Sequence, residues 1–161
     1  YFIIKAFSLL TLKEREKIKL NIVGEGNLKK KLKKFVKTNK YAHYYGFQYG
    51  KRLEKIYERS DVLIFPSVFD GWGVVPMEAM SQSLSLILSK NAGVTEIIEH
   101  KKNGYIIDSE TNSLLKAIRL LIRNPKIIKT QGRRNNNLLS NSLCNSKNSS
   151  NYLVKKILKT I

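Results

Sequence analysis

Short apolar segments alternate with amphipathic segments along most of the chain. The apolar segments have the length of buried strands, and turns that contain Gly, Asn or Pro follow several of them. The segments between them repeat apolar residues every three or four positions, as helices with one buried face do. This alternation predicts a parallel sheet with right-handed helical crossovers. The expected strands are residues 18–23, 42–45, 62–65, 84–88 and 105–107.

Helices are expected between and beyond these strands. In residues 27–37, the apolar side chains share one face and lysines crowd the opposite side. Asn27 stands where an N-cap residue would begin this helix. The expected helices are residues 1–11, 27–37, 52–59, 73–82, 94–100, 112–123 and 125–134.

The alternation ends after residue 134. Asn or Ser occupies twelve of the seventeen positions 135–151, and a stretch of this composition buries little apolar surface. A loop is therefore expected over 135–151, and the apolar spacing in 152–161 predicts a last helix. The expected organisation is one domain over 1–134, followed by this loop and this helix.

Composition points to a soluble globular domain. Of the 161 residues, 42% are hydrophobic and 26% are charged. No apolar run approaches the roughly 20 residues of a membrane span. The single cysteine, Cys144, excludes an internal disulfide and favours a reducing, cytoplasmic location. His43 and His100 stand apart from other ligand residues, which disfavours a bound metal.

The charge is strongly positive, with 30 Lys and Arg against 12 Asp and Glu, a net charge of +18. Three explanations are open: a Lys-, Asn- and Ile-rich coding bias on solvated faces, attraction to an anionic membrane surface, or binding to nucleic acid. The basic and aromatic interleaving of RNA-binding sheets is missing, which disfavours nucleic acid. Membrane attraction would place the protein peripherally on the inner membrane face.

Candidate chemistry is concentrated after the strand at 62–65. This strand leads through a Gly-containing loop into a helix, the arrangement by which parallel α/β sheets present a loop to a ligand. Asp70 lies in the loop, and Glu78 lies about one turn into the helix. Amides that open a helix are a natural seat for a phosphate. Here they belong to Gly73, Val74 and Val75.

Residues 69–80 resemble the nucleotide-sugar loop of retaining GT-B glycosyltransferases of family 4. The family pattern is an acidic residue, Gly, an aromatic residue, Gly, a few apolar residues and then Glu-Ala-Met, and here Asp70 is the first acid. The resemblance covers residues 1–134 and implies a Rossmann-like parallel sheet flanked by helices, the carboxy-terminal half of a GT-B fold. Its other matching segments are 23–26, 45–47, 60–67, 93–98 and 103–105.

The resemblance also implies roles for single residues. Glu78 would accept hydrogen bonds from the donor ribose, although a carboxylate in that position can simply stabilise a helix start. Asp70 would lie beside the transferred sugar as the catalytic carboxylate, although it could be a plain turn residue. The remaining donor-binding candidates are Gly71, Gly73, Val74 and Val75 at the phosphates, Gly24 and Gly26 in the first Gly-rich turn, and Tyr45, Gly46 and Phe47 beside the base.

The implied activity is retaining transfer of a hexose from a UDP- or GDP-sugar to a carbohydrate or lipid-linked acceptor, as in polysaccharide biosynthesis. The nucleotide sugar is a substrate, and the resemblance implies no cofactor or metal. The first strand of the domain, its basic diphosphate-binding loop and the amino-terminal acceptor domain would lie upstream of residue 1. The chain is therefore expected to be an inactive fragment. The alternative is a non-catalytic nucleotide-sugar-binding module or a decayed remnant.

One departure concerns the helix that contains Glu78. In the family this helix ends in a Gly, and a Pro follows two residues later. The chain has Ser83 and Ser85 at these positions. A weaker turn is expected there, without the loss of a ligand group.

Overall fold

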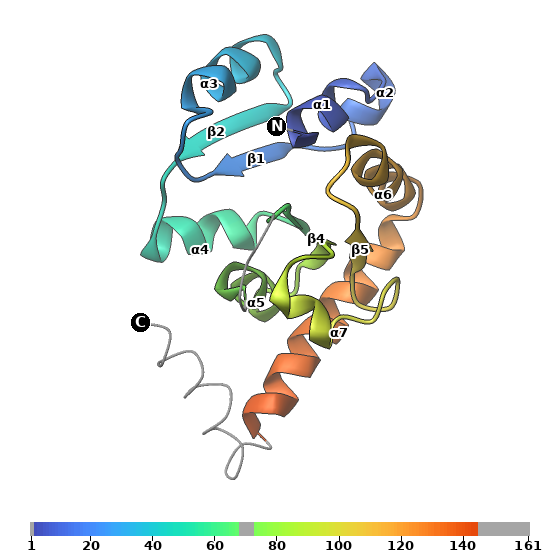
Figure 1. Cartoon of the computed structure of the whole chain (residues 1–161). Coiled ribbons are helices and arrows are strands. Elements are labelled where there is room, and N and C mark those ends of the chain that lie inside the picture. Colours follow the sequence, from blue (N-terminus) through green and yellow to red (C-terminus); the bar gives the residue numbers. More distant parts are fainter. Residues whose placement is uncertain (1, 68–72, 145–161) are drawn as a thin grey trace.

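The computed structural model describes residues 2–67 and 73–144, and all five expected strands are confirmed in it to within two residues. Every pairing is parallel, as predicted. β1 (Leu20–Val23) pairs with β2 (Ala42–Gly46), and a second sheet has the order β3-β4-β5 (Figure 1). The strands of the second sheet are β3 (Val62–Phe65), β4 (Ser85–Ser89) and β5 (Tyr105–Ile107).

Helices connect the strands, because parallel neighbours require a crossover. The helix between β1 and β2 is α3, the helix between β3 and β4 is α5, and α4 leads from the first sheet to the second. The bounds are α1 (Phe2–Ser8), α2 (Leu12–Arg15), α3 (Lys29–Thr38), α4 (Gly50–Glu58), α5 (Val74–Ser81), the 3-10 helix η1 (Gly93–Ile97), α6 (Thr111–Arg123) and α7 (Pro125–Cys144). No helix in these described ranges is both long and apolar enough to cross a membrane.

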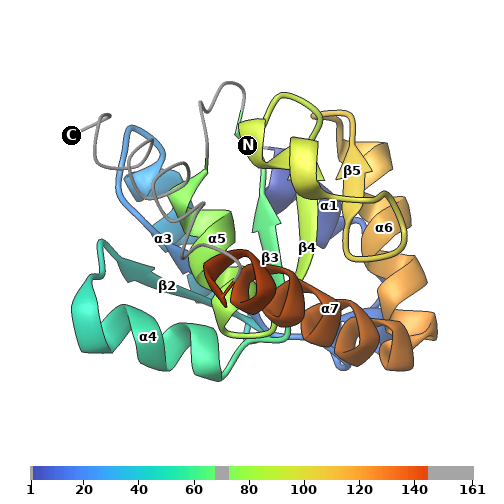
Figure 2. The same ribbon diagram turned by 90° about the horizontal axis from the view of Figure 1, so that it is seen from below.

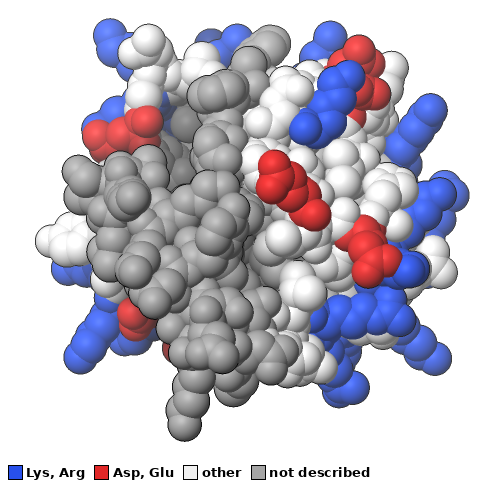
Figure 3. Space-filling model, turned by 60° about the horizontal axis from the view of Figure 1, so that its bottom comes forward, with Lys and Arg blue, Asp and Glu red and all other residues white. Residues whose placement is uncertain are grey.

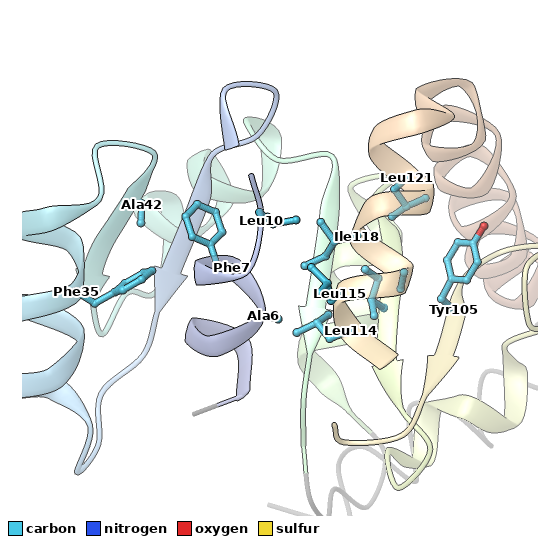
Figure 4. Close-up of a cluster of buried hydrophobic side chains, with 12 residues drawn as sticks. Ala6, Phe7, Leu10, Phe35, Ala42, Tyr105, Leu114, Leu115, Ile118 and Leu121 are labelled. Atoms are coloured by element: carbon cyan, nitrogen blue, oxygen red, sulfur yellow. The ribbon is translucent and has the colours of Figure 1, made fainter. Parts of the chain in front are cut away.

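One core cluster joins the two sheets. Phe7 of α1 meets Phe35 of α3 edge to face, with ring centroids 5.9 Å apart. The same cluster includes Ile87 of β4 and Leu114 and Ile118 of α6 (Figure 4). Helices α1, α3 and α6 therefore cover one side of both sheets and hold them together.

A second core cluster lies on the opposite side of β4. Leu86 and Leu88 point into it while Ile87 points into the first, as the two-residue period of a strand requires. Ala79 and Met80 of α5 complete its centre. β4 is buried along its whole length, which explains its nearly continuous apolar sequence.

Helix α7 corrects the prediction for residues 135–144, which form the second half of this helix and not a loop. Two of their Asn side chains bond to backbone carbonyls, one at the end of α5 and one directly before β4. Asn135 is fully buried and donates its Nδ2 to the carbonyl of Leu84 at 2.8 Å, and Asn136 donates to the carbonyl of Ser81 at 2.6 Å. Residues 145–151 and the expected helix over 152–161 lie outside the described residues.

Gln131 strengthens the same attachment one turn earlier. It donates Nε2 to the carbonyl of Lys101 at 3.0 Å and accepts a hydrogen bond from the hydroxyl of Ser85 at 2.5 Å. Figure 2 shows α7 crossing the end of the sheet at which β3 and β4 begin. Helix α7 thus closes one end of the sheet and leaves the other end to the candidate site.

Two further predictions about helices were wrong, and one helix was not predicted. Asn27 is not an N-cap, because α3 begins at Lys29 and Leu28 occupies the cap position without a side-chain bond. The segment expected as one helix over 94–100 is the shorter η1. The third error is the omission of α2, which starts with a capping box between Thr11 and Glu14, a Thr-x-x-Glu signal that is visible in the sequence.

The turn after α5 keeps the geometry of a glycine turn although Ser83 occupies it. Ser83 has φ 61°, and its N–H donates to the carbonyl of Met80 at 3.0 Å. The N–H of Leu84 donates to the carbonyl of Ala79 at 3.0 Å. These two bonds and the left-handed residue form a Schellman motif, which most helices build with Gly. The helix end is therefore regular, with Ser83 in a conformation that L-residues rarely adopt.

Candidate functional site

The carboxyl ends of β1 and β2 meet at two of the predicted glycines. The N–H of Gly24 donates to the carbonyl of Gly46 at 2.8 Å. Their φ angles are 118° and 70°, in the region that favours glycine. A Cβ on Gly46 would lie 3.5 Å from Oε1 of Glu25, whereas a Cβ on Gly26 would meet nothing within 4 Å. The backbone thus requires Gly24 and Gly46, and it does not require Gly26.

The predicted aromatic residues next to Gly46 are exposed. Phe47 is 67% exposed, with its ring centroid 6.0 Å from that of Tyr49, and Tyr45 packs on His43 at 4.3 Å. Two shallow grooves of about 260 and 250 Å³ lie beside Tyr45, and neither is lined by Glu78 or by any other residue of α5. These rings are free to stack on a flat ligand, but the grooves do not connect them to Glu78.

The loop that follows β3 is anchored by a bond that sequence reasoning missed. The buried hydroxyl of Ser89, at the end of β4, donates to the carbonyl of Ser67. The available signal was a serine that ends an otherwise apolar strand. Asp70 and Gly71, two of the predicted site residues, lie outside the described residues, as does Trp72. Their roles stay predictions.

Helix α5 begins where it was expected, directly after Gly73. This glycine has φ 73° and is buried, and a Cβ on it would lie 3.2 Å from Pro76 and 3.4 Å from Val94. Both the backbone angle and the packing therefore require glycine here. The N–H of Met77 donates to the carbonyl of Gly73 at 3.3 Å, across the first turn of the helix. The amides of Val74 and Val75 precede this bond, at the positive end of the helix.

The side chain of Glu78 lies on the same face of α5 as the side chains of Val74 and Val75, because Glu78 follows them by four and three residues. Its carboxylate is not a free surface group. The hydroxyl of Tyr57, on α4, donates to Oε2 of Glu78 at 3.0 Å. Burial, and then the nearby negative charge of Glu78, raise the pKa of Tyr57 far above its ordinary value, so Tyr57 remains a donor. In the sequence, Leu53, Ile56 and Tyr57 share the apolar face of the helix expected over 52–59, which predicts that Tyr57 points inward but gives it no partner.

Two charged pairs flank these groups at the carboxyl ends of the strands. Lys29 bonds to Glu25 at 2.7 Å, and Lys90 bonds to Asp108 at 2.7 Å. All four side chains are well exposed, so the pairs contribute little to stability. Within residues 2–67 and 73–144, no group of three His, Cys, Asp or Glu side chains is placed to hold a metal ion.

The arrangement suits an anionic ligand that also carries hydroxyl groups. Helix-start amides bind phosphate oxygens, an ionised carboxylate accepts from hydroxyls, and exposed rings stack on a base. Such ligand sites lie at the carboxyl ends of the strands in parallel α/β sheets. The fold defines a Rossmann-like α/β domain, and its candidate ligand-binding groups lie at the carboxyl ends of its strands.

The family follows from comparison with known proteins. The model of the family described as Glycosyl transferases group 1 matches residues 2–138, so the chain belongs to this family. A relative from Methanocaldococcus jannaschii, an uncharacterised glycosyltransferase, is 35% identical over 94 residues, which are 56% of this chain and 24% of the relative. The chain therefore spans about a quarter of that protein's length.

Solved structures confirm the GT-B relationship of the fold. The carboxy-terminal domain of LpcC, a group 1 family protein of Francisella tularensis, superposes with a TM-score of 0.77 at 23% identity, covering 88% of this chain and 77% of that domain. HepE of Anabaena, solved in complex with UDP and glucose, superposes with a TM-score of 0.73 at 19% identity, covering 87% of this chain and 39% of that protein. The prediction of a Rossmann-like half of a GT-B fold is confirmed.

Proposed function

We propose that this chain is the donor-binding part of a retaining glycosyltransferase that moves a hexose from a UDP- or GDP-sugar to a carbohydrate or lipid-linked acceptor. One observation on α5 carries this proposal. Glu78 lies one turn after Val74 and Val75, on the helix face of their side chains, and the free amides of Val74 and Val75 open the same helix. A nucleoside diphosphate presents a diphosphate and two ribose hydroxyls close together, which matches this pairing of groups.

Each group has a distinct task in the proposal. The amides at the start of α5 hold the diphosphate and stabilise its charge as the sugar leaves. Glu78 accepts hydrogen bonds from the ribose, and Tyr45 and Phe47 flank the base. Asp70 belongs beside the sugar, where a carboxylate favours developing positive charge.

UDP is the first nucleotide to test. The Anabaena protein with the same fold was solved with UDP and glucose bound. The acceptor would be bound by another part of a longer protein, since the chain spans only 24% of its Methanocaldococcus relative. The isolated chain should therefore bind nucleotide but transfer no sugar.

Titration calorimetry with UDP tests the proposal. Glu78→Ala should weaken UDP binding by roughly 1.5–3 kcal/mol, because a charge-assisted hydrogen bond is lost. Glu54→Ala, at an exposed position of α4, is the matched control for losing one negative charge and should leave the affinity unchanged. Equal UDP affinity of the wild type and Glu78→Ala would contradict the assignment.

Transfer assays separate an enzyme from a non-catalytic binding module. In a longer protein that contains this chain, Asp70→Asn should abolish sugar transfer while UDP affinity stays nearly unchanged. A longer protein that binds UDP tightly and transfers no sugar from UDP- or GDP-hexoses would favour the binding module. Sugar transfer by the isolated chain from a radiolabelled donor would show that the acceptor site is already present.

A further inference from the structure

Tyr57 and Glu78 come from different helices and meet through one hydrogen bond of 3.0 Å. Tyr57 is only 8% exposed, and its ring is packed in the core cluster that contains Ala79, Met80 and Leu86. A ring packed in this way has few orientations available, so its hydroxyl is a nearly fixed point. A hydroxyl that is held in place by core packing therefore bonds to one carboxylate oxygen of Glu78, an exposed residue.

Glu78 needs such a contact to have a defined position. It lies on the exposed side of α5, where a glutamate side chain samples several rotamers. The Tyr57 hydroxyl uses one lone pair of Oε2 and leaves Oε1 available to other donors. The bond therefore selects one orientation of the carboxylate without occupying its full accepting capacity.

We infer that Tyr57 is a positioning residue for nucleotide binding: its hydroxyl holds the Glu78 carboxylate in the orientation that receives the ribose hydroxyls of a nucleoside diphosphate. This inference rests on the proposed function of Glu78. It makes Tyr57 a determinant of the preference for ribose over 2′-deoxyribose, because a correctly oriented carboxylate gains most from a ligand that has both hydroxyls. Tyr57 itself does not touch the nucleotide.

A merely structural role for Tyr57 gives different expectations. A buried tyrosine stabilises α4 against α5 through its ring, and the ring is kept in Tyr57→Phe. A structural loss would lower the unfolding temperature and would act equally on every ligand. A positioning role acts only through Glu78, so it disappears when Glu78 is removed.

The test is calorimetry with UDP and 2′-deoxy-UDP on five forms of the chain: wild type, Tyr57→Phe, Glu78→Ala, the double variant and Tyr105→Phe. Tyr105→Phe is the matched control, because Tyr105 is also a buried tyrosine but interacts with Gln131 of α7. Tyr57→Phe should weaken UDP binding roughly three- to tenfold, which is less than the loss of a whole hydrogen bond to a charged group, because the Glu78 carboxylate remains and loses only its fixed orientation. Tyr57→Phe should weaken the binding of 2′-deoxy-UDP less than that of UDP. On the Glu78→Ala background, it should cause no further loss of UDP affinity. Tyr105→Phe should leave both affinities unchanged.

Unchanged UDP affinity of Tyr57→Phe would overturn the inference, and so would an equal loss on the Glu78→Ala background. If Tyr57→Phe does not fold, Glu78→Asp is the variant to measure in its place. The shorter side chain keeps the negative charge, but its carboxylate no longer reaches the Tyr57 hydroxyl. Wild-type UDP affinity in Glu78→Asp would overturn the inference, because the carboxylate would then bind the nucleotide equally well without the Tyr57 contact. A wild-type chain that binds neither UDP nor GDP, or a Glu78→Ala variant with full affinity, would overturn the proposed function and this inference with it.

Discussion

The backbone of Gly132 in α7 lies directly against the carbonyl group of Ser83, in the turn that follows α5. A Cβ added to Gly132 would lie 1.9 Å from the carbonyl oxygen of Ser83 and 2.8 Å from its carbonyl carbon. This glycine lies in a helix interior, where alanine would ordinarily be preferred. Close contact between α7 and the start of β4 therefore depends on the missing side chain.

Gly132→Ala should destabilise the chain by roughly 1–3 kcal/mol, because the helix must move away from the turn. The measurement is urea unfolding followed by circular dichroism. Gly26→Ala is the control, since its Cβ would meet nothing within 4 Å and should change stability little. A stabilised Gly132→Ala, as helix propensity alone would give, would show that this contact is not as close as the structure has it.

Ser83→Gly should stabilise the chain by about 1 kcal/mol, since glycine adopts the left-handed conformation of a Schellman turn without the steric cost of a Cβ. Ser83 has φ 61° and is exposed. The same unfolding measurement applies. Ser81→Gly, within α5, should have the opposite sign, because glycine is a poor helix former. A loss of stability in Ser83→Gly would refute this account of the turn.

Asn135→Ala should cost roughly 1–3 kcal/mol of unfolding free energy, because the buried carbonyl of Leu84 would lose its partner. Asn137, two residues further along α7, is exposed. Asn137→Ala should be neutral or slightly stabilising, since alanine is the better helix former. Equal effects of the two substitutions would mean that Asn135 does not anchor the helix.

The contrast between Asn135 and Asn137 shows where sequence reasoning stopped. The strands were predictable because their apolar side chains are buried on both faces, as in β4, and any apolar residue satisfies such a site. The helical continuation through residue 135 depends on single polar side chains that reach particular carbonyls. The high Asn and Ser content of residues 135–151 indicates a loop, because composition does not distinguish an Asn that bonds to a carbonyl from an exposed Asn. The wrong loop prediction follows from relying on composition.

The candidate site was predictable to a similar extent. Gly24, Gly46 and Gly73, three of the predicted site residues, adopt positive φ angles, which gives a backbone reason for glycine at these positions. Helical spacing also placed Tyr57 inward. It could not show that Tyr57 reaches Glu78, because this pairing depends on how α4 packs beside α5. Contacts between elements are properties of the packed fold and carry no local signal.

Stability should depend on pH through Tyr57. An unfolded tyrosine ionises near pH 10, whereas burial and the Glu78 charge raise the pKa of Tyr57 in the folded chain. The folded state keeps the proton to higher pH, so this contribution to stability is complete below about pH 10 and is lost as the pH rises further. The unfolding free energy of the wild type should therefore fall more steeply above pH 10 than that of Tyr57→Phe. Tyr49→Phe, at an exposed position, should show the same dependence of unfolding free energy on pH as the wild type. If Tyr57→Phe also had the wild-type slope above pH 10, the burial of Tyr57 and its bond to Glu78 would be contradicted.

The net charge of +18 should give salt-sensitive binding to anionic vesicles. On the face seen in Figure 3, basic side chains lie mainly around the rim, and acidic side chains lie both near the centre and at the rim. Several exposed lysines are clustered on α3. Each lysine close to an anionic surface contributes about 1 kcal/mol to the binding free energy. Such attraction is screened by salt. We therefore expect sedimentation with phosphatidylserine vesicles at low salt, less at physiological salt, and none with neutral lipid.

Two sets of substitutions separate a local patch from net charge alone. The first set replaces exposed lysines of α3 with glutamine, at Lys30, Lys33, Lys34 and Lys37. The second removes the same number of positive charges from exposed positions elsewhere, at Lys51, Lys55, Lys116 and Lys126. If α3 is the contact, the first set should lose most of the binding and the second should keep it, whereas equal losses would indicate net charge. If the wild-type chain stays in the supernatant with both lipids at both salt concentrations, membrane attraction is excluded. The result would favour the coding-bias explanation, in which the basic residues only lie on solvated faces.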